Sequence, residues 1–71
     1  IEIFVPLLNE GTDVVRPTLG QVIAPSVVQV LATPNYDALD EIWQFPPGTK
    51  VRCVAENRQG KHVLVARQRL E

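Results

Sequence analysis

The chain has 71 residues, of which 45% are hydrophobic and 21% are charged, and its net charge is −1. This length predicts one domain over residues 1–69, with residues 70–71 interpreted as a vector-derived scar, and it excludes a doubly wound sheet or a two-domain enzyme. The charge is uneven, because residues 1–49 carry six acids and one base whereas residues 50–71 carry two acids and six bases.

Abundant β-branched residues and six prolines favour strands over helices. The first strand is expected over residues 1–7, where apolar residues alternate. Pro6 has no N–H to donate, so we expect this strand to lie at a sheet edge or to end there. A turn is expected over residues 9–13.

A second strand is expected to start at Asp13, to halt at Pro17 and to resume over residues 21–24, beyond a bend or bulge at Gly20. A tight turn at residues 25–26 leads into a third strand over residues 27–33. Three residues of that strand are expected to point inward: Val28, Val30 and Ala32.

Residues 34–41 are irregular and allow at most one short helical or 3₁₀ turn. A short strand is expected over residues 42–45. The Pro46-Pro47-Gly48 sequence that follows indicates a type II turn with proline at its second position and glycine at its third.

Residues 49–56 and 61–69 flank Gln59-Gly60 and predict a β-hairpin. A two-residue loop would place Arg52 opposite Arg67, an unfavourable pair unless an anion lies nearby. One face of this hairpin is apolar and is expected to cover the core: Val51, Cys53, Ala55, Leu64 and Ala66.

Five or six short strands in so short a chain need a closed arrangement, because an open sheet leaves unpaired edges and an uncovered face. We therefore predict an all-β fold, a small five- to six-stranded SH3-like barrel with at most one short helical or 3₁₀ turn. An OB-fold fits less well, since it usually needs a longer chain and a helix.

Residues 40–69, DEIWQFPPGTKVRCVAENRQGKHVLVARQR, resemble the second half of an SH3 domain. The acidic pair at residues 40–41, the turn ending in Gly48 and the alanine at position 66 have similar spacing. The paired tryptophans of that family are replaced by His62 and Val63, and its long acidic loop is almost missing. The resemblance implies the barrel but not the recognition of proline-rich peptides.

Three motifs resemble a family of small bacterial proteins without assigned function: FVPLLNEGTDVVRP (4–17), LATPNYD (31–37) and WQFPPGTKVRC (43–53). The chain departs from that family at Val15, where an aromatic residue is expected, and over residues 23–26, where a glycine-rich turn is expected. The resemblance covers nearly the whole chain. It implies a small β-barrel and brings no catalytic residues.

Residues that carry chemistry are few. His62 is interpreted as a surface or half-buried strand residue rather than a metal ligand, and Cys53 as a core residue rather than a nucleophile. The carboxylates of Asp37, Asp40 and Glu41 are interpreted as a solvated loop rather than a glycosidase pair or a calcium site. We therefore expect no enzyme activity, no cofactor and no metal.

Arg16 is the one base among residues 1–49, so we expect it to have an acidic partner, Asp37 or Glu41, across the barrel. A direct pair with Asp13 would need the strand to twist. On this reasoning, replacing Arg16 with alanine should cost more stability than replacing Arg58.

The best candidates for binding are aromatic and proline residues around the short fourth strand. Trp43 and Phe45 share one face of that strand and are either core residues or part of an exposed patch. The candidate protein-binding patch comprises Tyr36, Trp43, Phe45, Pro46 and Pro47.

A basic face on the hairpin is the alternative, and it suggests nucleic-acid binding. It comprises Lys50, Arg52, Arg58, Lys61 and Arg67. The isoelectric point of about 5.7 and the separation of aromatic from basic residues weigh against this alternative.

The sequence thus predicts a small, non-enzymatic module for binding a protein partner. A single cysteine, no basic leader and no apolar run long enough to span a bilayer indicate a cytoplasmic protein that makes no contact with the membrane. We expect a monomer, or a weak homodimer formed by strand addition at the first strand.

Overall fold

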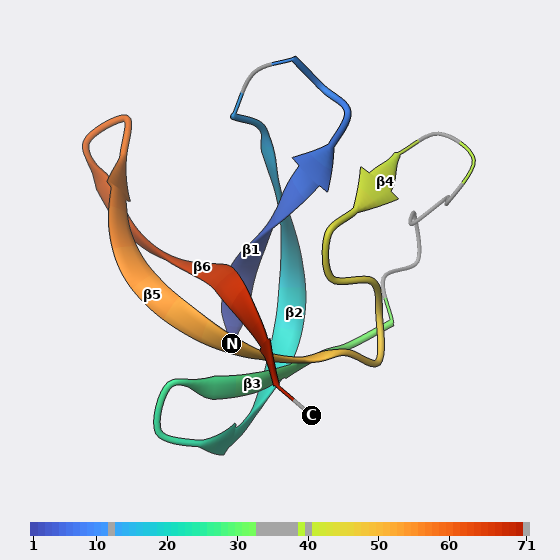
Figure 1. Cartoon of the computed structure of the whole chain (residues 1–71). Coiled ribbons are helices and arrows are strands. Elements are labelled where there is room, and N and C mark those ends of the chain that lie inside the picture. Colours follow the sequence, from blue (N-terminus) through green and yellow to red (C-terminus); the bar gives the residue numbers. More distant parts are fainter. Residues whose placement is uncertain (12, 33–38, 40, 71) are drawn as a thin grey trace.

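The computed structural model describes residues 1–11, 13–32, 39 and 41–70. This part of the chain is all-β, as predicted (Figure 1). Its six strands are β1 (Glu2–Leu8), β2 (Val15–Ala24), β3 (Val27–Val30), β4 (Ile42–Trp43), β5 (Lys50–Arg58) and β6 (Lys61–Leu70). None of the described residues forms a helix with the length and apolar character needed to cross a membrane.

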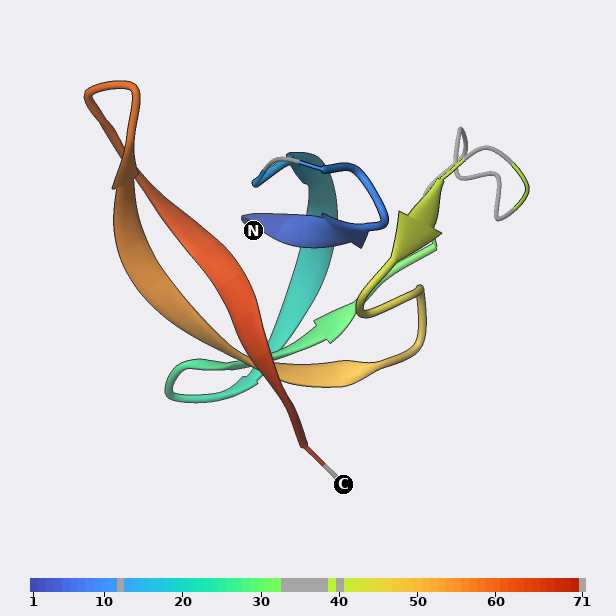
Figure 2. The ribbon, with the colours of Figure 1, turned by 45° about the horizontal axis from the view of Figure 1, so that its top comes forward.

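Five of the strands close into a ring. Antiparallel pairs join β1 to β2, β2 to β3, β3 to β5 and β5 to β6. The ring closes where Phe4 of β1 lies beside Val65 of β6 in a parallel arrangement. The short β4 attaches to the end of β1. Figure 2 shows the tip of the β5–β6 hairpin extending beyond the other strands of the ring. This arrangement is compatible with the small SH3-like all-β fold that was predicted.

The first strand neither lies at an edge nor ends at Pro6, because it is paired on both sides and runs on to Leu8, so the prediction drawn from Pro6 is wrong. The amide of Leu7 donates to the carbonyl of Val14 on the β2 side, and the carbonyl of Pro6 accepts from the amide of Gln44 on the other side, each at 2.9 Å. Neighbouring residues of a strand direct their backbone groups to opposite edges. The missing N–H of Pro6 therefore faces the point where β1 changes partner from β6 to β4. Because β1 pairs with β2 along one side and with β6 and β4 along the other, a further strand cannot add to it there.

The second strand is longer than predicted, because it continues through Pro17 and bends between two partners. Its first half pairs with β1 and its second half with β3. The change of partner occurs at Gly20, where an added Cβ would lie 2.2 Å from Cγ1 of Val28. The predicted irregularity occurs slightly later, between Val22 and Ala24.

The predicted turns at residues 46–49 and 59–60 are present. Thr49 donates its amide to the carbonyl of Pro46, and Gly48 has a φ of 95°, as a type II turn requires. In the β5–β6 hairpin Gln59 and Gly60 have φ values of 52° and 81°, which match the type I′ turn of a two-residue loop.

The hairpin keeps the predicted register from Arg58–Lys61 to Cys53–Ala66. An irregularity between Arg52 and Cys53 then shifts the pairing by one residue, so Arg52 lies opposite Gln68 rather than Arg67. The predicted clash between two arginines is therefore absent.

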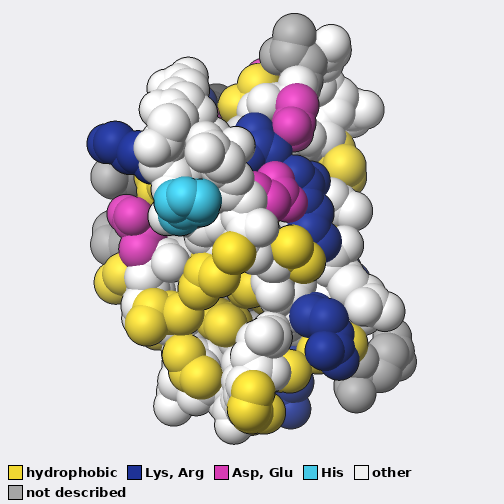
Figure 3. Space-filling view, turned by 90° about the vertical axis from the view of Figure 1, so that its left-hand side faces the viewer, with side chains coloured by type: hydrophobic (Ala, Val, Ile, Leu, Met, Phe, Trp, Pro, Cys, Tyr) yellow, Lys and Arg dark blue, Asp and Glu magenta, His cyan; other side chains and the backbone are white. Residues whose placement is uncertain are grey.

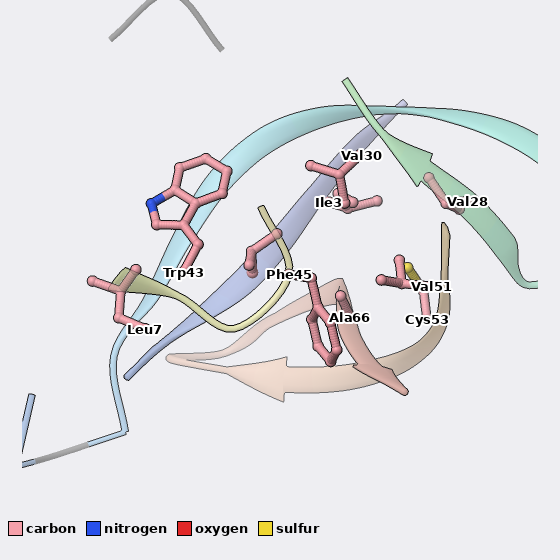
Figure 4. Packing of buried hydrophobic residues seen from close by; sticks show 10 residues of the cluster. Ile3, Leu7, Val28, Val30, Trp43, Phe45, Val51, Cys53 and Ala66 are labelled. Atoms are coloured by element: carbon pink, nitrogen blue, oxygen red, sulfur yellow. The ribbon is translucent and has the colours of Figure 1, made fainter. Parts of the chain in front are cut away.

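The core fills the ring between the strands (Figure 4). Its members are Ile3, Val5, Leu7, Val28, Val30, Trp43, Phe45, Val51, Cys53 and Ala66. Three of the predicted inward positions are wrong: Ala32 lies beyond the end of β3, and Ala55 and Leu64 lie on the part of the hairpin beyond the ring; all three are exposed. The hairpin tip exposes Leu64, whereas Val65 on the opposite face is fully buried. Only the root of the hairpin covers the core with its predicted face.

Candidate protein-binding groove

An open groove of about 720 Å³ lies between the tip of the β5–β6 hairpin and the segment that joins β1 to β2. We call it the tip groove. Ten described residues line it: Phe4, Asp13, Val14, Val15, Glu56, Asn57, Arg58, Gln59, Lys61 and Val63. They come from both ends of the chain, and the closure of the ring brings them together.

The apolar part of the tip groove comes from both sides. Phe4 of β1 and Val14 and Val15 at the start of β2 lie on one side, and Val63 of β6 lies on the other; all four are half-buried. Val63 is on the hairpin face that was predicted to point away from the core. Beyond the ring, this face turns toward β1 and the β1–β2 connection instead.

Four charged side chains form a network along the hairpin wall of the tip groove. Arg58 donates to Asp13 at 2.8 Å and contacts Glu56 at 3.4 Å. Arg67 binds Glu56 through two hydrogen bonds of 2.5 and 2.7 Å. The contact of Arg58 with Asp13 pairs a base from the basic C-terminal part of the chain with an acid from the acidic N-terminal part.

The network affects the ionisation of its central carboxylate. Its hydrogen bonds to Arg67, together with the positive charges of Arg67 and Arg58, hold the pKa of Glu56 below its ordinary value. The same carboxylate raises the pKa of Arg67. Glu56 therefore remains negatively charged between two guanidinium groups.

Lys61 and one nitrogen atom of Arg58 are not matched in this way. Lys61 is exposed and makes no ion pair with another described residue. Nε of Arg58 is buried and has no hydrogen-bond acceptor among the described residues. A buried donor without an acceptor is unfavourable.

The predicted basic face is divided by the fold. Arg58 and Arg67 direct their charges to Glu56 and Asp13. Lys61 lies at the hairpin tip, whereas Lys50 and Arg52 lie at the root of β5 opposite residues 29 and 27 of β3. The five bases do not form one continuous cationic surface.

The predicted aromatic patch is also changed by the fold. Trp43 and Phe45 are only 6% and 3% exposed and belong to the core, the first of the two alternatives for these residues. Pro46 and Pro47 are half-buried, and Tyr36 lies outside the described residues. The condition for the patch, an exposed Trp43, is therefore not met.

Arg16 has the acidic partner that was expected. Its Nε donates to Oε2 of Glu41 at 2.5 Å, and Oε1 of the same carboxylate accepts from Trp43 Nε1 at 3.3 Å. Glu41 thereby anchors β4 to β2. Asp37 and Asp40, the other members of the predicted carboxylate cluster, lie outside the described residues.

The two side chains with reactive potential lie apart from each other. His62 is exposed on β6, as expected. Cys53 is buried, as expected, and burial raises the pKa of its thiol. Within the described ranges no three histidine, cysteine or acidic side chains are grouped so that they could hold a metal ion.

The β2–β3 hairpin presents a different kind of surface. No charged residue occurs between Arg16 and Asp37, and the exposed fractions of Leu19, Val22 and Ile23 are 60%, 54% and 48%. Figure 3 shows the side of the molecule on which both hairpins project, with hydrophobic side chains (yellow) gathered below the histidine and charged side chains above and beside them.

Sequence reasoning missed the tip groove. The available signal was the second face of the β5–β6 hairpin, where Val63 and Val65 also need cover. The contact between Arg58 and Asp13 joins residues 45 positions apart, and no local pattern in the sequence indicates it. No family model, curated protein or solved structure matches this chain; membership in the small bacterial family stays a prediction.

Proposed function

We propose that this domain is a non-enzymatic interaction module that binds a segment of a partner protein in the tip groove. One observation carries the proposal: half-buried apolar side chains, Phe4, Val15 and Val63 among them, line an open groove whose hairpin wall is held by ion pairs. Apolar surface with a polar border is the usual composition of a protein interface. The wall is ordered before a partner arrives, which lowers the entropy cost of binding.

The described lining supports binding rather than catalysis. It contains no histidine, cysteine or serine, and its two carboxylates are held by arginines. A nucleophile with an adjacent base is therefore lacking within this lining. We expect a cytoplasmic location, because a lone buried thiol such as Cys53 suits a reducing compartment.

Nucleic-acid binding remains the alternative. It is less favoured because the bases of the hairpin are divided between its tip and its root, and because Glu56 and Asp13 place negative charge at the tip groove. Binding to phosphates would also depend steeply on salt.

The proposal can be tested by selecting peptides from a random library displayed on phage. The matched variants are Val63→Asn, in the tip groove, and Val54→Asn, on the neighbouring strand outside it. We expect the selected peptides to bind Val63→Asn at least tenfold more weakly than the wild type, and Val54→Asn with unchanged affinity. Circular dichroism establishes that both variants are folded.

The proposal is wrong if no peptide is enriched, or if both variants bind the enriched peptides equally. Amide NMR spectra with a pool of single-stranded oligonucleotides test the alternative. Shifts confined to the region of Lys50 and Arg52 that vanish in salt would favour nucleic acid.

A further inference from the structure

We propose that the tip groove selects an acidic segment, in which a carboxylate lies two residues from an apolar side chain along an extended chain. This inference rests on the proposed function, since it assigns the chemistry of the peptide that the groove binds. It is carried by the balance of charge in the groove and by the spacing of two residues on β6.

The carboxylates of the tip groove are already neutralised. Asp13 accepts a hydrogen bond from Arg58, and Glu56 lies between Arg58 and Arg67. Two acids and two bases therefore cancel within the network. A basic ligand would have to compete with Arg58 and Arg67 for these carboxylates.

The remaining charge is positive. Lys61 lines the groove, is exposed and has no acidic partner among the described residues. Arg58 lies opposite Lys61 in the register of the β5–β6 hairpin, and its buried Nε lacks an acceptor among the described residues. An incoming carboxylate would pair with Lys61, and a small shift of Arg58 toward it would give this donor an acceptor as well.

The spacing of the ligand follows from β6. Lys61 and Val63 are two residues apart on one strand and both line the groove, so they share a face. A peptide extended alongside this strand presents side chains with the same spacing, about 7 Å for two residues. Its carboxylate would reach Lys61 while its apolar side chain covers Val63 and Phe4.

A nucleic acid also offers negative charge, but it fits the groove less well. Stacking of bases requires aromatic surfaces, and the described lining has one aromatic residue, Phe4, among three valines. The favoured occupant is therefore a protein segment, and an oligonucleotide becomes an outcome of the test.

The test uses the peptides enriched from the random library. We expect aspartate or glutamate to be enriched two positions from an apolar residue. Charge reversal by Lys61→Glu should lower the affinity for these peptides at least tenfold. Lys50→Glu, the matched charge reversal at the root of β5, should leave this affinity unchanged. Changing the peptide's acid to lysine should restore binding to Lys61→Glu.

The possible failures are distinguishable. Enriched peptides that bind the groove but carry no acid, or that bind Lys61→Glu as tightly as the wild type, would overturn this inference and leave the proposed function standing. Absence of any groove-binding peptide would overturn both. Tighter binding of a single-stranded oligonucleotide than of the peptides, sensitive to Lys61→Glu, would replace the protein segment with a nucleic acid.

Discussion

The β2–β3 and β5–β6 hairpins lie side by side in the ring and carry opposite kinds of surface. Where they meet, the amide of Cys53 in β5 donates to the carbonyl of Ser26 in the β2–β3 turn at 2.9 Å. The tip of β5–β6 carries the ion-pair network around Glu56. From Pro17 to Val30 the β2–β3 hairpin carries no charged residue, and it exposes Val22 and Ile23.

The difference teaches where charge is useful in so small a domain. The β5–β6 tip reaches beyond the ring and must be held against the β1–β2 connection, and the contact of Arg58 with Asp13 supplies part of that hold. The β2–β3 hairpin is held by its neighbours in the sheet and by Gly20, which lets it pack closely on the core.

The largest expected effect is in the β2–β3 hairpin. In Gly20→Ala the new methyl group would overlap Val28, and we expect a loss of about 3 kcal/mol in the free energy of unfolding. In the other hairpin, Gly60→Ala meets no atom within 4 Å but strains a residue with a φ of 81°, for a loss of about 1 kcal/mol. Urea unfolding measures both. Equal losses would show that steric overlap is not what makes Gly20 necessary.

A smaller effect is expected for the ion pairs, with an order opposite to the one the sequence suggested. Arg58 contacts two carboxylates and its side chain is 23% exposed, whereas Arg16 contacts one and is 52% exposed. Arg58→Ala should cost about 1–2 kcal/mol and Arg16→Ala about 0.5 kcal/mol. The same urea experiment decides the order, and a larger loss for Arg16→Ala would restore the expectation from sequence.

The charged tip should also show in the pH dependence of stability. The pKa of Glu56 is lower in the folded protein than its ordinary value of 4.5, so its ionised form favours folding. This contribution is complete above about pH 4.5 and is lost as the pH falls through the folded pKa. Thermal unfolding between pH 3 and 7 should show a weaker dependence for Glu56→Gln than for the wild type. Identical pH profiles for the two proteins would show that the ionisation of Glu56 does not contribute to stability.

The smallest effect is expected at the uncharged surface. Ile23 is 48% exposed at the irregular part of β2, so Ile23→Lys should change the free energy of unfolding by less than about 0.5 kcal/mol. A loss of several times that size, measured in urea, would show that this surface contributes to the packing of the monomer.

Much of the fold was predictable because its signals are local. Alternation of apolar residues marked β1, and Gln59-Gly60 fixed the turn and the register of β5–β6 down to Cys53. The predictions failed where closure of the ring determines which strand a segment pairs with. Pro6 indicated an edge, but the missing N–H coincides with a change of partner. Pro17 indicated the end of a strand, but pairing with β1 carries β2 through it.

The candidate site was far less predictable. Trp43 and Phe45 were candidates both for the core and for a surface patch, and only their position inside the ring decides between the two. The basic face assumed that every base on the hairpin is available, whereas Glu56 holds Arg67 and contacts Arg58. The tip groove depends on Phe4 meeting the far end of the chain, which no sequence window contains.

The position of β1 has a consequence for how the protein is made. This strand is synthesised before the other five strands, yet one of its partners, β6, is synthesised after them, and the ring closes through the contact between Phe4 and Val65. During synthesis β1 cannot pair with β6 until β6 has been made, and pairing between such distant segments then forms slowly. A nascent chain stalled before β6 would therefore expose an unsatisfied strand edge, the kind of surface that chaperones and aggregating chains both recognise.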